Sequence, residues 1–414
     1  MIDPVAVATP VTTGSCFDEA ILGLPFYEPR HMALAHRISE WCDTRGDLWT
    51  TSERDPERTG LGIIRALGED GWLAFLDPAA TPGQAMEGDA RSLCLMREAL
   101  AYADDLADYA FSIQALSATP ILRYGSEGQR RRYLPGLASG EIVSSFAISE
   151  EEAGSDVAAI GLRAERAGDG YVLNGHKAWI ANGGIADVHC VIARTGEAPG
   201  ALGLTAFLVP ATAPGVRVRE RIAAIAPRSF AHLAFEDCYV PADSVLGRPC
   251  GGFVIAMDVL ARFRMTVGAA AIGFARRASD AALARARSRP MNGGRLLDLP
   301  TVKETFAGFE VKLNAAALLV TRAAWELDQG NRSFGKHSSI AKLYATEAAQ
   351  EIVDDAVQIF GAAGLVAGSV TERLYRQIRS LRIYEGTSEI QKTIIAGALD
   401  LRRANRRPMG SRRS

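Results

Sequence analysis

Apolar residues recur at three- and four-residue steps in two long parts of the chain. From residue 28 to about residue 139 this spacing predicts helices, and after residue 253 it predicts longer ones. The helices expected in the second part cover residues 254–287, 301–329, 339–360, 369–382 and 388–403. Because these long helices are joined by short connections, we expect them to pack as an up-and-down bundle.

Between the two helical parts the pattern changes to that of β-strands. Short apolar runs predict strands at residues 143–148, 188–193, 204–209, 216–219 and 233–240. Asn174 and Gly175 separate two further runs, and Asn-Gly in that position predicts a hairpin turn. Strands and helices do not alternate in this part, so a Rossmann fold is not expected.

These patterns divide the chain into an α+β protein of three parts. We expect an extended lead-in and an N-terminal all-α domain, then a middle β domain, a C-terminal helical bundle and a basic tail. The boundaries are placed at residues 1–25, 26–142, 143–250, 251–403 and 404–414. A chain of 414 residues has room for two or three such domains.

Composition excludes several classes of function. The formal net charge is −2, so no overall field attracts nucleic acid or an anionic membrane, and neither is an expected partner. Six arginines lie between residues 402 and 413; a solvated tail is the main expectation, and contact with nucleic acid or an acidic partner is the alternative.

The six cysteines are scattered, which predicts free thiols in a reducing compartment and no metal site. No signal-peptide pattern opens the chain, and no uncharged apolar run reaches the roughly 18 residues that span a bilayer. We therefore expect a cytoplasmic protein.

Three short stretches carry candidate chemistry. Glu385 directly precedes Gly386 between two predicted helices, so the stretch is either a carboxylate base beside a close backbone approach or an ordinary helix break. Gly154 and Ser155 follow a predicted strand in a turn that could present N–H groups and a hydroxyl to a pyrophosphate. Trp179 lies on a strand, where it could cover a planar ligand or fill the core.

Five motifs in this chain resemble those of the acyl-CoA dehydrogenase family. They are AISEEEAGSD at 147–156, YVLNGHKAWIANG at 171–183, LAFEDCYVPADSVLG at 233–247, VQIFGAAG at 357–364 and IYEGTSEIQ at 383–391. They follow the family's order and spacing across about residues 90–400, which makes the resemblance specific. The resemblance implies a middle β-barrel or sandwich domain and a C-terminal four-helix bundle.

The resemblance also implies bound FAD and the α,β-dehydrogenation of an acyl thioester. Glu385 matches the catalytic base, which removes the α-proton while flavin N5 takes the β-hydride. Its backbone N–H and a ribityl hydroxyl would bond the thioester carbonyl, and burial is expected to raise the pKa of Glu385 toward neutrality. Some relatives place the base on another helix, but the matching position here is Phe263, which cannot act as one.

Family roles carry over to matching positions of this sequence. The expected cofactor-binding residues are Phe146, Ile148, Ser149, Gly154, Ser155, Trp179, Ala181, Arg289, Gln358, Gly361, Thr387 and Glu389. The expected substrate-binding residues are Ser155, Arg264, Tyr384 and Gly386. Arg289 and Gln358 match positions that reach FAD in a neighbouring subunit, which implies a homodimer or homotetramer. An electron-transfer flavoprotein is the expected electron acceptor.

Three departures from the family pattern keep alternatives open. Ala181 replaces a threonine near the flavin, which leaves a flavin oxidase or monooxygenase as a less favoured reading. Ala261 and Gly397 replace an Asp and an Arg that help to hold the thioester arm and CoA. Acyl-CoA is thus the first expected substrate and an acyl-carrier-protein thioester the second, with a non-catalytic scaffold as the remaining alternative.

Overall fold

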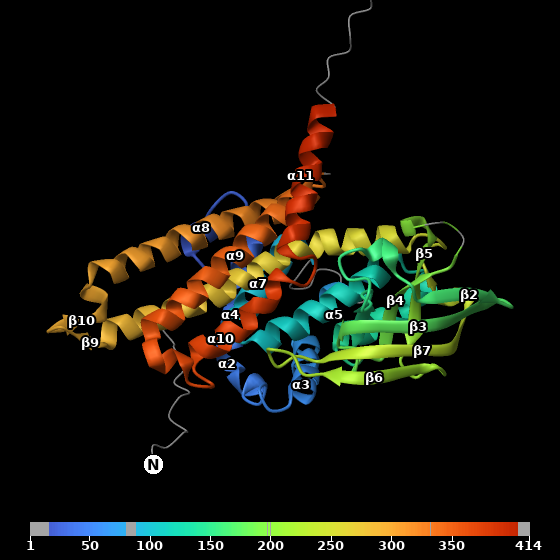
Figure 1. Cartoon of the computed structure of the whole chain (residues 1–414), viewed down its shortest axis with the longest axis horizontal. Coiled ribbons are helices and arrows are strands. Elements are labelled where there is room, and N and C mark those ends of the chain that lie inside the picture. Colours follow the sequence, from blue (N-terminus) through green and yellow to red (C-terminus); the bar gives the residue numbers. More distant parts are fainter. Residues whose placement is uncertain (1–15, 80–87, 197, 199, 332, 405–414) are drawn as a thin grey trace, which may run out of the picture. The chain divides into compact units, whose positions relative to one another are not determined.

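The computed structural model describes residues 16–79, 88–196, 198, 200–331 and 333–404. The chain divides into two compact units, Thr13–Leu260 and Ala261–Ser414. The first contains the N-terminal helices and the β-sheet, and the second contains the C-terminal helices (Figure 1). Most of the predicted lead-in and nearly all of the basic tail lie outside the described residues.

The helices between residues 29 and 139 lie where the apolar spacing predicted helices, but a short helix at Glu19–Leu22 lies in the stretch expected to be an extended lead-in, because the side chain of Asp18 caps it. The N-terminal helices are α1 (Glu19–Leu22), α2 (Pro29–Thr44), α3 (Pro56–Glu69), α4 (Ala90–Ala103), α5 (Asp105–Tyr124) and α6 (Glu127–Ser139). Asp104 separates α4 from α5 because its carboxylate accepts from the N–H of Leu106 at 2.9 Å and caps the second helix. Ser126 begins α6 in the same way, with Gln129 completing a capping box.

Eight strands form one sheet in the same unit. They are β1 (Ser144–Ala147), β2 (Arg163–Ala167), β3 (Gly170–Ala181), β4 (Val188–Arg194), β5 (Leu204–Pro210), β6 (Val216–Ile222), β7 (Phe230–Pro241) and β8 (Val245–Leu246). Their order is β6-β7-β3-β2-β4-β5-β8, and β1 pairs with β4 in parallel. Leu173, Phe207 and Phe235 are among the fully buried side chains of the sheet's core.

The hairpin predicted at Asn174 and Gly175 is wrong. Strand β3 continues through both residues, and the register against β7 shifts between Leu173 and Gly175. The side chain of Asn174 bonds to Asp237 on β7, so the pair forms an irregularity in a long strand. The turn lies instead between β2 and β3, and β2 itself was missed because its sequence, RAERA, contains few apolar residues.

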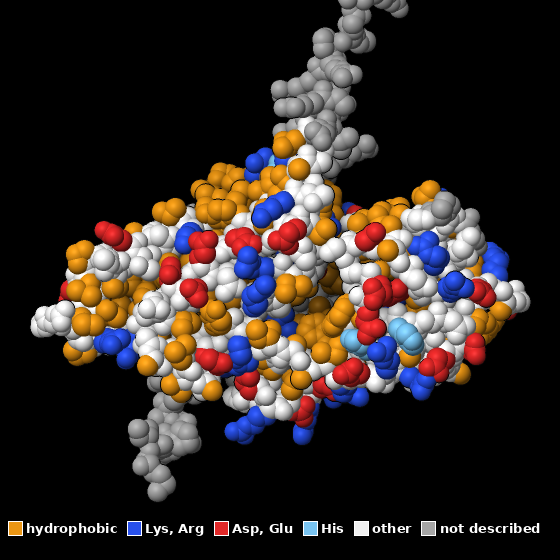
Figure 2. Space-filling model, in the orientation of Figure 1, with side chains coloured by type: hydrophobic (Ala, Val, Ile, Leu, Met, Phe, Trp, Pro, Cys, Tyr) orange, Lys and Arg blue, Asp and Glu red, His pale blue; other side chains and the backbone are white. Residues whose placement is uncertain are grey.

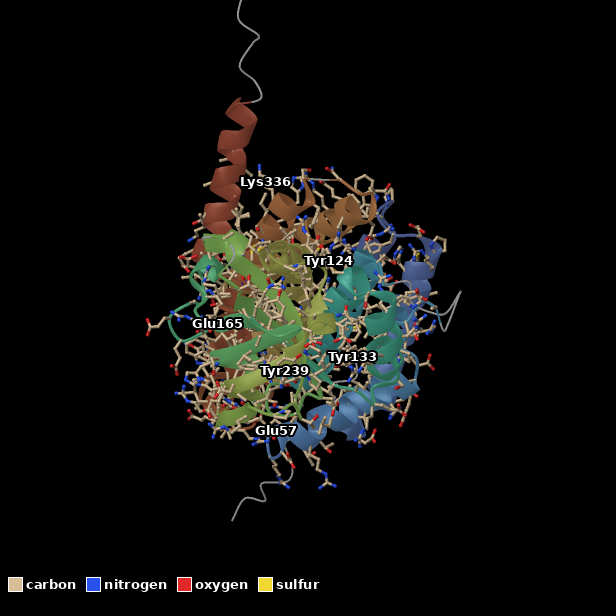
Figure 3. All side chains as sticks on the ribbon, turned by 90° about the vertical axis from the view of Figure 1, so that its right-hand side faces the viewer. Glu57, Tyr124, Tyr133, Glu165, Tyr239 and Lys336 are labelled. Carbon is tan, nitrogen blue, oxygen red and sulfur yellow. The ribbon has the colours of Figure 1, made fainter. Side chains whose placement is uncertain are left out.

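Helix α5 ties the helices of the first unit to the sheet. The hydroxyl of Tyr109 donates to Ser229 O at 2.5 Å and accepts from the N–H of Asn182 at 3.2 Å. Asp105 forms a buried ion pair with Arg228. Figure 3 labels Glu57 of α3 near the end of the sheet, where Nε of Arg221 on β6 donates to its carboxylate at 3.1 Å.

The second unit is the predicted bundle. It contains α7 (Gly252–Ser288) from Ala261 onward, α8 (Pro300–Asp328), α9 (Phe334–Phe360), α10 (Val370–Ile378) and α11 (Ser388–Ala404), with a small hairpin of β9 (Pro290–Met291) and β10 (Gly294–Arg295). Helix α9 contacts α8, α10 and α11. A Cβ on Gly268 of α7 would lie 2.8 Å from Val320 of α8, so glycine permits these two helices to approach closely.

The charged side chains at the surface are mixed in sign, as the balanced composition suggests. Acidic and basic side chains are interspersed on the face shown in Figure 2. Among the helices that the structure describes, none is long and apolar enough to cross a bilayer. All six cysteines are free thiols.

Candidate active site

Glu385 lies in a strained turn between two helical segments of the second unit. The turn follows the short 3-10 helix η8 (Arg379–Arg382) and precedes α11. Glu385 has φ 54° and Gly386 has φ 92°, so two consecutive residues adopt left-handed backbone conformations. A side chain in this region costs about 1 kcal/mol, and such strain concentrates at functional sites.

Gly386 is required by geometry as well as by conformation. A Cβ at this position would lie 2.7 Å from Nε2 of Gln391 and 3.3 Å from a side-chain carbon of Ile390. The backbone of the turn is therefore packed directly against the first turn of α11. The sequence suggested a different close approach, that of the backbone to a bound ligand, and this stays a prediction.

Three side chains from three helices hold the carbonyl groups of this turn. Nζ of Lys342 on α9 donates to Tyr384 O at 3.0 Å and to Gly386 O at 2.6 Å. Nε2 of Gln391 on α11 donates to Gly386 O at 2.8 Å and to Glu385 O at 3.3 Å. Nε of Arg264 on α7 donates to Glu385 O at 3.4 Å.

Two buried cationic side chains, Lys342 and Arg264, lie near the carboxylate of Glu385, the candidate base. Burial lowers the pKa of Lys342 to about 8, although the nearby carboxylate of Glu385 acts in the opposite direction. Burial also lowers the pKa of Arg264, again against the attraction of Glu385. The structure thus places Arg264 beside Glu385, and its predicted role in substrate binding stays a prediction. The expected upward shift in the pKa of Glu385 stays a prediction.

The residues after the turn begin α11. The N–H of Ile390 donates to the hydroxyl of Thr387 at 3.4 Å, and Ser388 donates to Glu347 at 2.5 Å. Glu389 is exposed, and backbone N–H bonding at the helix start holds its pKa below the ordinary value. Thr387 is half-buried and Glu389 is exposed, and their contact with FAD stays a prediction.

A second group of predicted residues meets at the far end of α7. The guanidinium of Arg289 lies 3.6 Å from where a Cβ on Gly361 would stand. Gly361 has φ 64° and follows α9, and its N–H donates to the carbonyl of Gln358. Arg289, Gln358 and Gly361 are therefore neighbours, although Arg289 is distant from the others in sequence.

The β-sheet carries the remaining predicted residues in the first unit. The carbonyl of Ser149 accepts from the N–H of Ala178 at 2.9 Å, which places the end of β1 beside the residue before Trp179. Trp179 has φ 55° and lies where the register of β3 against β7 is irregular. Its indole is 50% exposed and meets His232 edge-on, with ring centroids 5.7 Å apart. The alternative that Trp179 is a core aromatic is therefore wrong.

A buried lysine fixes the turn that follows β1. Nζ of Lys177 donates to Ile148 O at 2.8 Å and to Glu150 Oε1 at 2.8 Å. Glu150 also accepts from the N–H groups of Gly161 and Leu162, at 2.7 and 2.9 Å. Burial lowers the pKa of Lys177 to about 8. Burial acts to raise the pKa of Glu150, but the ammonium of Lys177 and the two backbone N–H groups together hold it below its ordinary value.

Three family models match the chain in sequence order. The N-terminal domain of acyl-CoA dehydrogenase matches residues 29–141, its middle domain residues 145–238 and its C-terminal domain residues 251–399. The chain belongs to the acyl-CoA dehydrogenase family. Its members are FAD-dependent oxidoreductases that act on CH–CH groups.

Individual relatives are similar over most of their length. The mouse mitochondrial short-chain specific acyl-CoA dehydrogenase is 38% identical over 339 residues, which are 81% of this chain and 82% of the relative. The structure of butyryl-CoA dehydrogenase from Megasphaera elsdenii is similar with a TM-score of 0.83 and 30% identity, over 90% of this chain and 98% of that one. The structure of the prolyl acyl carrier protein oxidase AnaB is similar with a TM-score of 0.83 and 27% identity, over 90% of this chain and 99% of that one.

The residues of the acyl-CoA dehydrogenase sheet fit a flavin dinucleotide. Trp179 presents a large exposed aromatic surface, which suits a planar ring system. Gly154 and Ser155 are exposed, and a Cβ on Gly154 would meet nothing within 4 Å, so the turn leaves room for a diphosphate beside its N–H and hydroxyl donors. Phe146 on β1, Ser149 just after β1 and Ala181 at the end of β3 are half-buried.

Sequence reasoning missed the side chains that hold the two turns. Lys342, Lys177 and Gln391 are fully buried, and each bonds backbone carbonyls of a candidate site. One signal was available for Lys342, because it shares a helix face with the small residues Ser338, Ala345 and Ala349, which suit a closely packed interface. A lysine on such a face is rarely buried unless a partner satisfies its charge.

Proposed function

We propose that this acyl-CoA dehydrogenase homologue desaturates an acyl thioester between Cα and Cβ, with Glu385 as the general base. The observation that carries the proposal is the left-handed conformation of Glu385 in a turn whose carbonyls are held from α7, α9 and α11. A strained non-glycine residue persists only where its surroundings fix it. The hydrogen bonds that fix this strained turn also fix the position of the Glu385 carboxylate. A carboxylate held in place in this way is suited to removing a proton from a bound substrate.

The chemistry needs both the carboxylate and the backbone of this turn. A thioester α-proton is too weak an acid for a carboxylate in water, so hydrogen bonds must stabilise the developing negative charge on the carbonyl oxygen. The N–H of Glu385 is the protein donor proposed for that oxygen. Glu385 then accepts the α-proton, and the electrons of the Cα–H bond form the new C=C bond. FAD, when bound, supplies the two-electron acceptor that takes the hydride from Cβ, and the product is a trans-2-enoyl thioester.

Bleaching of the flavin tests this proposal directly. The FAD-loaded protein is mixed under anaerobic conditions with saturated acyl thioesters, and absorbance near the flavin maximum is followed together with product formation. The proposal predicts loss of flavin colour and one enoyl product per flavin reduced. Stable colour with every thioester offered to the fully loaded protein would contradict it.

The carrier of the acyl group is proposed to be CoA, with a carrier protein as the second candidate. Similarity to short-chain and butyryl-CoA dehydrogenases supports CoA. Similarity to a prolyl acyl carrier protein oxidase supports the alternative. So does Gly397, which is exposed and has open space around its Cα where an arginine often contacts CoA. The same acyl group offered on CoA and on a carrier protein decides between them through kcat/KM.

The electron acceptor and assembly are also proposals. We propose an electron-transfer flavoprotein as acceptor, and a homodimer or homotetramer in which Arg289 and Gln358 reach the neighbouring subunit's FAD. Ala181 is the residue that leaves oxygen as an alternative acceptor, because a hydroxyl is missing there. Hydrogen peroxide formed in air without added acceptor would favour the oxidase. Light scattering of the FAD-loaded protein gives the number of subunits.

A further inference from the structure

We infer that Lys342 is a positioning residue that orients the peptide between Tyr384 and Glu385, so that the Glu385 N–H faces the substrate's thioester carbonyl. The inference rests on the proposed function. Lys342 does not belong to the family motifs quoted above, and it lies on α9, 42 residues before Tyr384.

The two bonds of Lys342 fix the direction of two peptide groups. Its ammonium bonds the carbonyls of Tyr384 and Gly386, at 3.0 and 2.6 Å. In a trans peptide the C=O and the N–H point in opposite directions. The carbonyl of Tyr384 points toward Lys342, so the N–H of Glu385, which belongs to the same peptide group, points to the opposite side.

An ammonium is suited to this position for two reasons. It has three donors that rotate freely about the end of the side chain, and it can therefore bond two carbonyls that are not parallel. Its charge also favours the ionised form of the Glu385 carboxylate nearby, which the base needs. Lys342 is fully buried, and such a charge is expensive to bury unless it is bonded as it is here.

The other anchors of the turn do not replace Lys342. Gln391 bonds the carbonyls of Glu385 and Gly386, and Arg264 bonds that of Glu385. Those bonds act on the carbonyls of Glu385 and Gly386, whereas Lys342 also bonds the carbonyl of Tyr384, which belongs to the same peptide group as the N–H of Glu385.

The test uses Lys342→Met, which keeps the length of the side chain and removes its donors. Lys336→Met is the matched control, because Lys336 is a half-buried lysine six residues earlier on the same helix and thus on another side of it (labelled in Figure 3). Flavin content and thermal unfolding are measured first for every FAD-loaded variant. With both intact, we expect Lys342→Met to lower kcat roughly 100-fold with little change in KM, the pattern for an interaction made mainly in the transition state.

A second measurement reports on the hydrogen bonds to the thioester carbonyl oxygen and needs no turnover. Acetoacetyl-pantetheine carries the thioester arm common to CoA and carrier proteins, and its acidic α-carbon forms an enolate that absorbs in the ultraviolet. We expect the FAD-loaded wild type and Lys336→Met to bind it largely as the enolate. In Lys342→Met the enolate fraction at a given pH should fall about tenfold, because the N–H of Glu385 is no longer held toward the oxygen.

The outcomes separate this inference from the proposed function. If Glu385→Gln turns over normally, the proposed base is wrong. If Glu385→Gln is inactive but folded Lys342→Met keeps wild-type kcat and enolate fraction, only the role of Lys342 is wrong. Should Lys342→Met fail to fold, Lys342→Gln takes its place, because its amide can still bond one carbonyl, and an intermediate loss is expected. Failure of both variants to fold would show a purely structural role and overturn the inference.

Discussion

Lys177 and Glu150 form an ion pair of 2.8 Å in which the lysine is completely buried. The same lysine bonds Ile148 O, while Glu150 accepts two backbone N–H groups from the segment before β2. The pair therefore joins the end of β1, strand β3 and the chain entering β2. This is the turn that carries Ser149 and leads to Gly154 and Ser155.

Removal of Lys177 should damage both stability and cofactor binding. Lys177→Met leaves the Glu150 carboxylate without its cation, and breaking a buried pair from one side costs about 3 kcal/mol. Denaturant unfolding measures this loss, and FAD retention on gel filtration should fall with it. Arg217→Met, which breaks an exposed pair with Glu236 on the same sheet, is the control and should change the free energy of unfolding by less than about 1 kcal/mol. Equal effects of the two variants would contradict the prediction.

Trp179 should matter for FAD and little for folding. Half of its surface is exposed, so Trp179→Ala should change the free energy of unfolding of the FAD-free protein by roughly 0.5 kcal/mol or less. The affinity for FAD should fall at least tenfold, because the aromatic surface proposed to lie against the flavin is gone. Titration with FAD, followed by fluorescence, measures this. Leu202→Ala removes an even more exposed apolar side chain from the same unit and should leave FAD affinity unchanged.

Two glycines of the second unit should respond to alanine in opposite directions. Gly386→Ala places a Cβ 2.7 Å from Gln391 at a residue with positive φ, and it should destabilise the protein by about 2 kcal/mol and impair turnover. Gly397 lies inside α11 with open space around it, so Gly397→Ala should stabilise the protein by about 0.5 kcal/mol. Thermal unfolding gives both signs. If Gly386→Ala left the stability unchanged, the turn would not require a glycine, contrary to this prediction.

His189 should make the first unit sensitive to mild acid. Its ring shares a hydrogen bond of 2.7 Å with Ser145, and burial lowers its pKa to about 4. Between that value and the ordinary value of about 6.5, the unfolded chain binds a proton that the folded chain does not. Stability is therefore expected to fall as the pH decreases through this range, by about 3 kcal/mol in total for this group.

Urea unfolding at pH 7.5, 6 and 4.5 measures the contribution of His189. His189→Gln should lose stability less steeply than the wild type as the pH falls. His36→Gln, at an exposed histidine, should retain the wild-type slope. A slope unchanged in His189→Gln would show that other groups govern the acid sensitivity.

The sequence was most informative where local rules decide the structure. The long C-terminal helices and most strands follow from apolar spacing. Asn174-Gly175 misled because its local hairpin preference lost to pairing of the whole of β3 with β7. The site anchors could not be predicted in detail, because the contact of Lys342 with Tyr384 joins helix α9 to a turn 42 residues later.

The central claim, that Glu385 is the base, is tested most directly by Glu385→Gln in anaerobic rapid mixing. The change keeps the shape of the side chain and the backbone N–H but removes the proton acceptor. Glu351→Gln, at an exposed residue paired with Lys312 on the same unit, is the matched control. We predict that FAD-loaded Glu385→Gln binds the thioester but loses flavin colour roughly 10³-fold more slowly than the wild type and Glu351→Gln. Bleaching of Glu385→Gln at the wild-type rate would contradict the account.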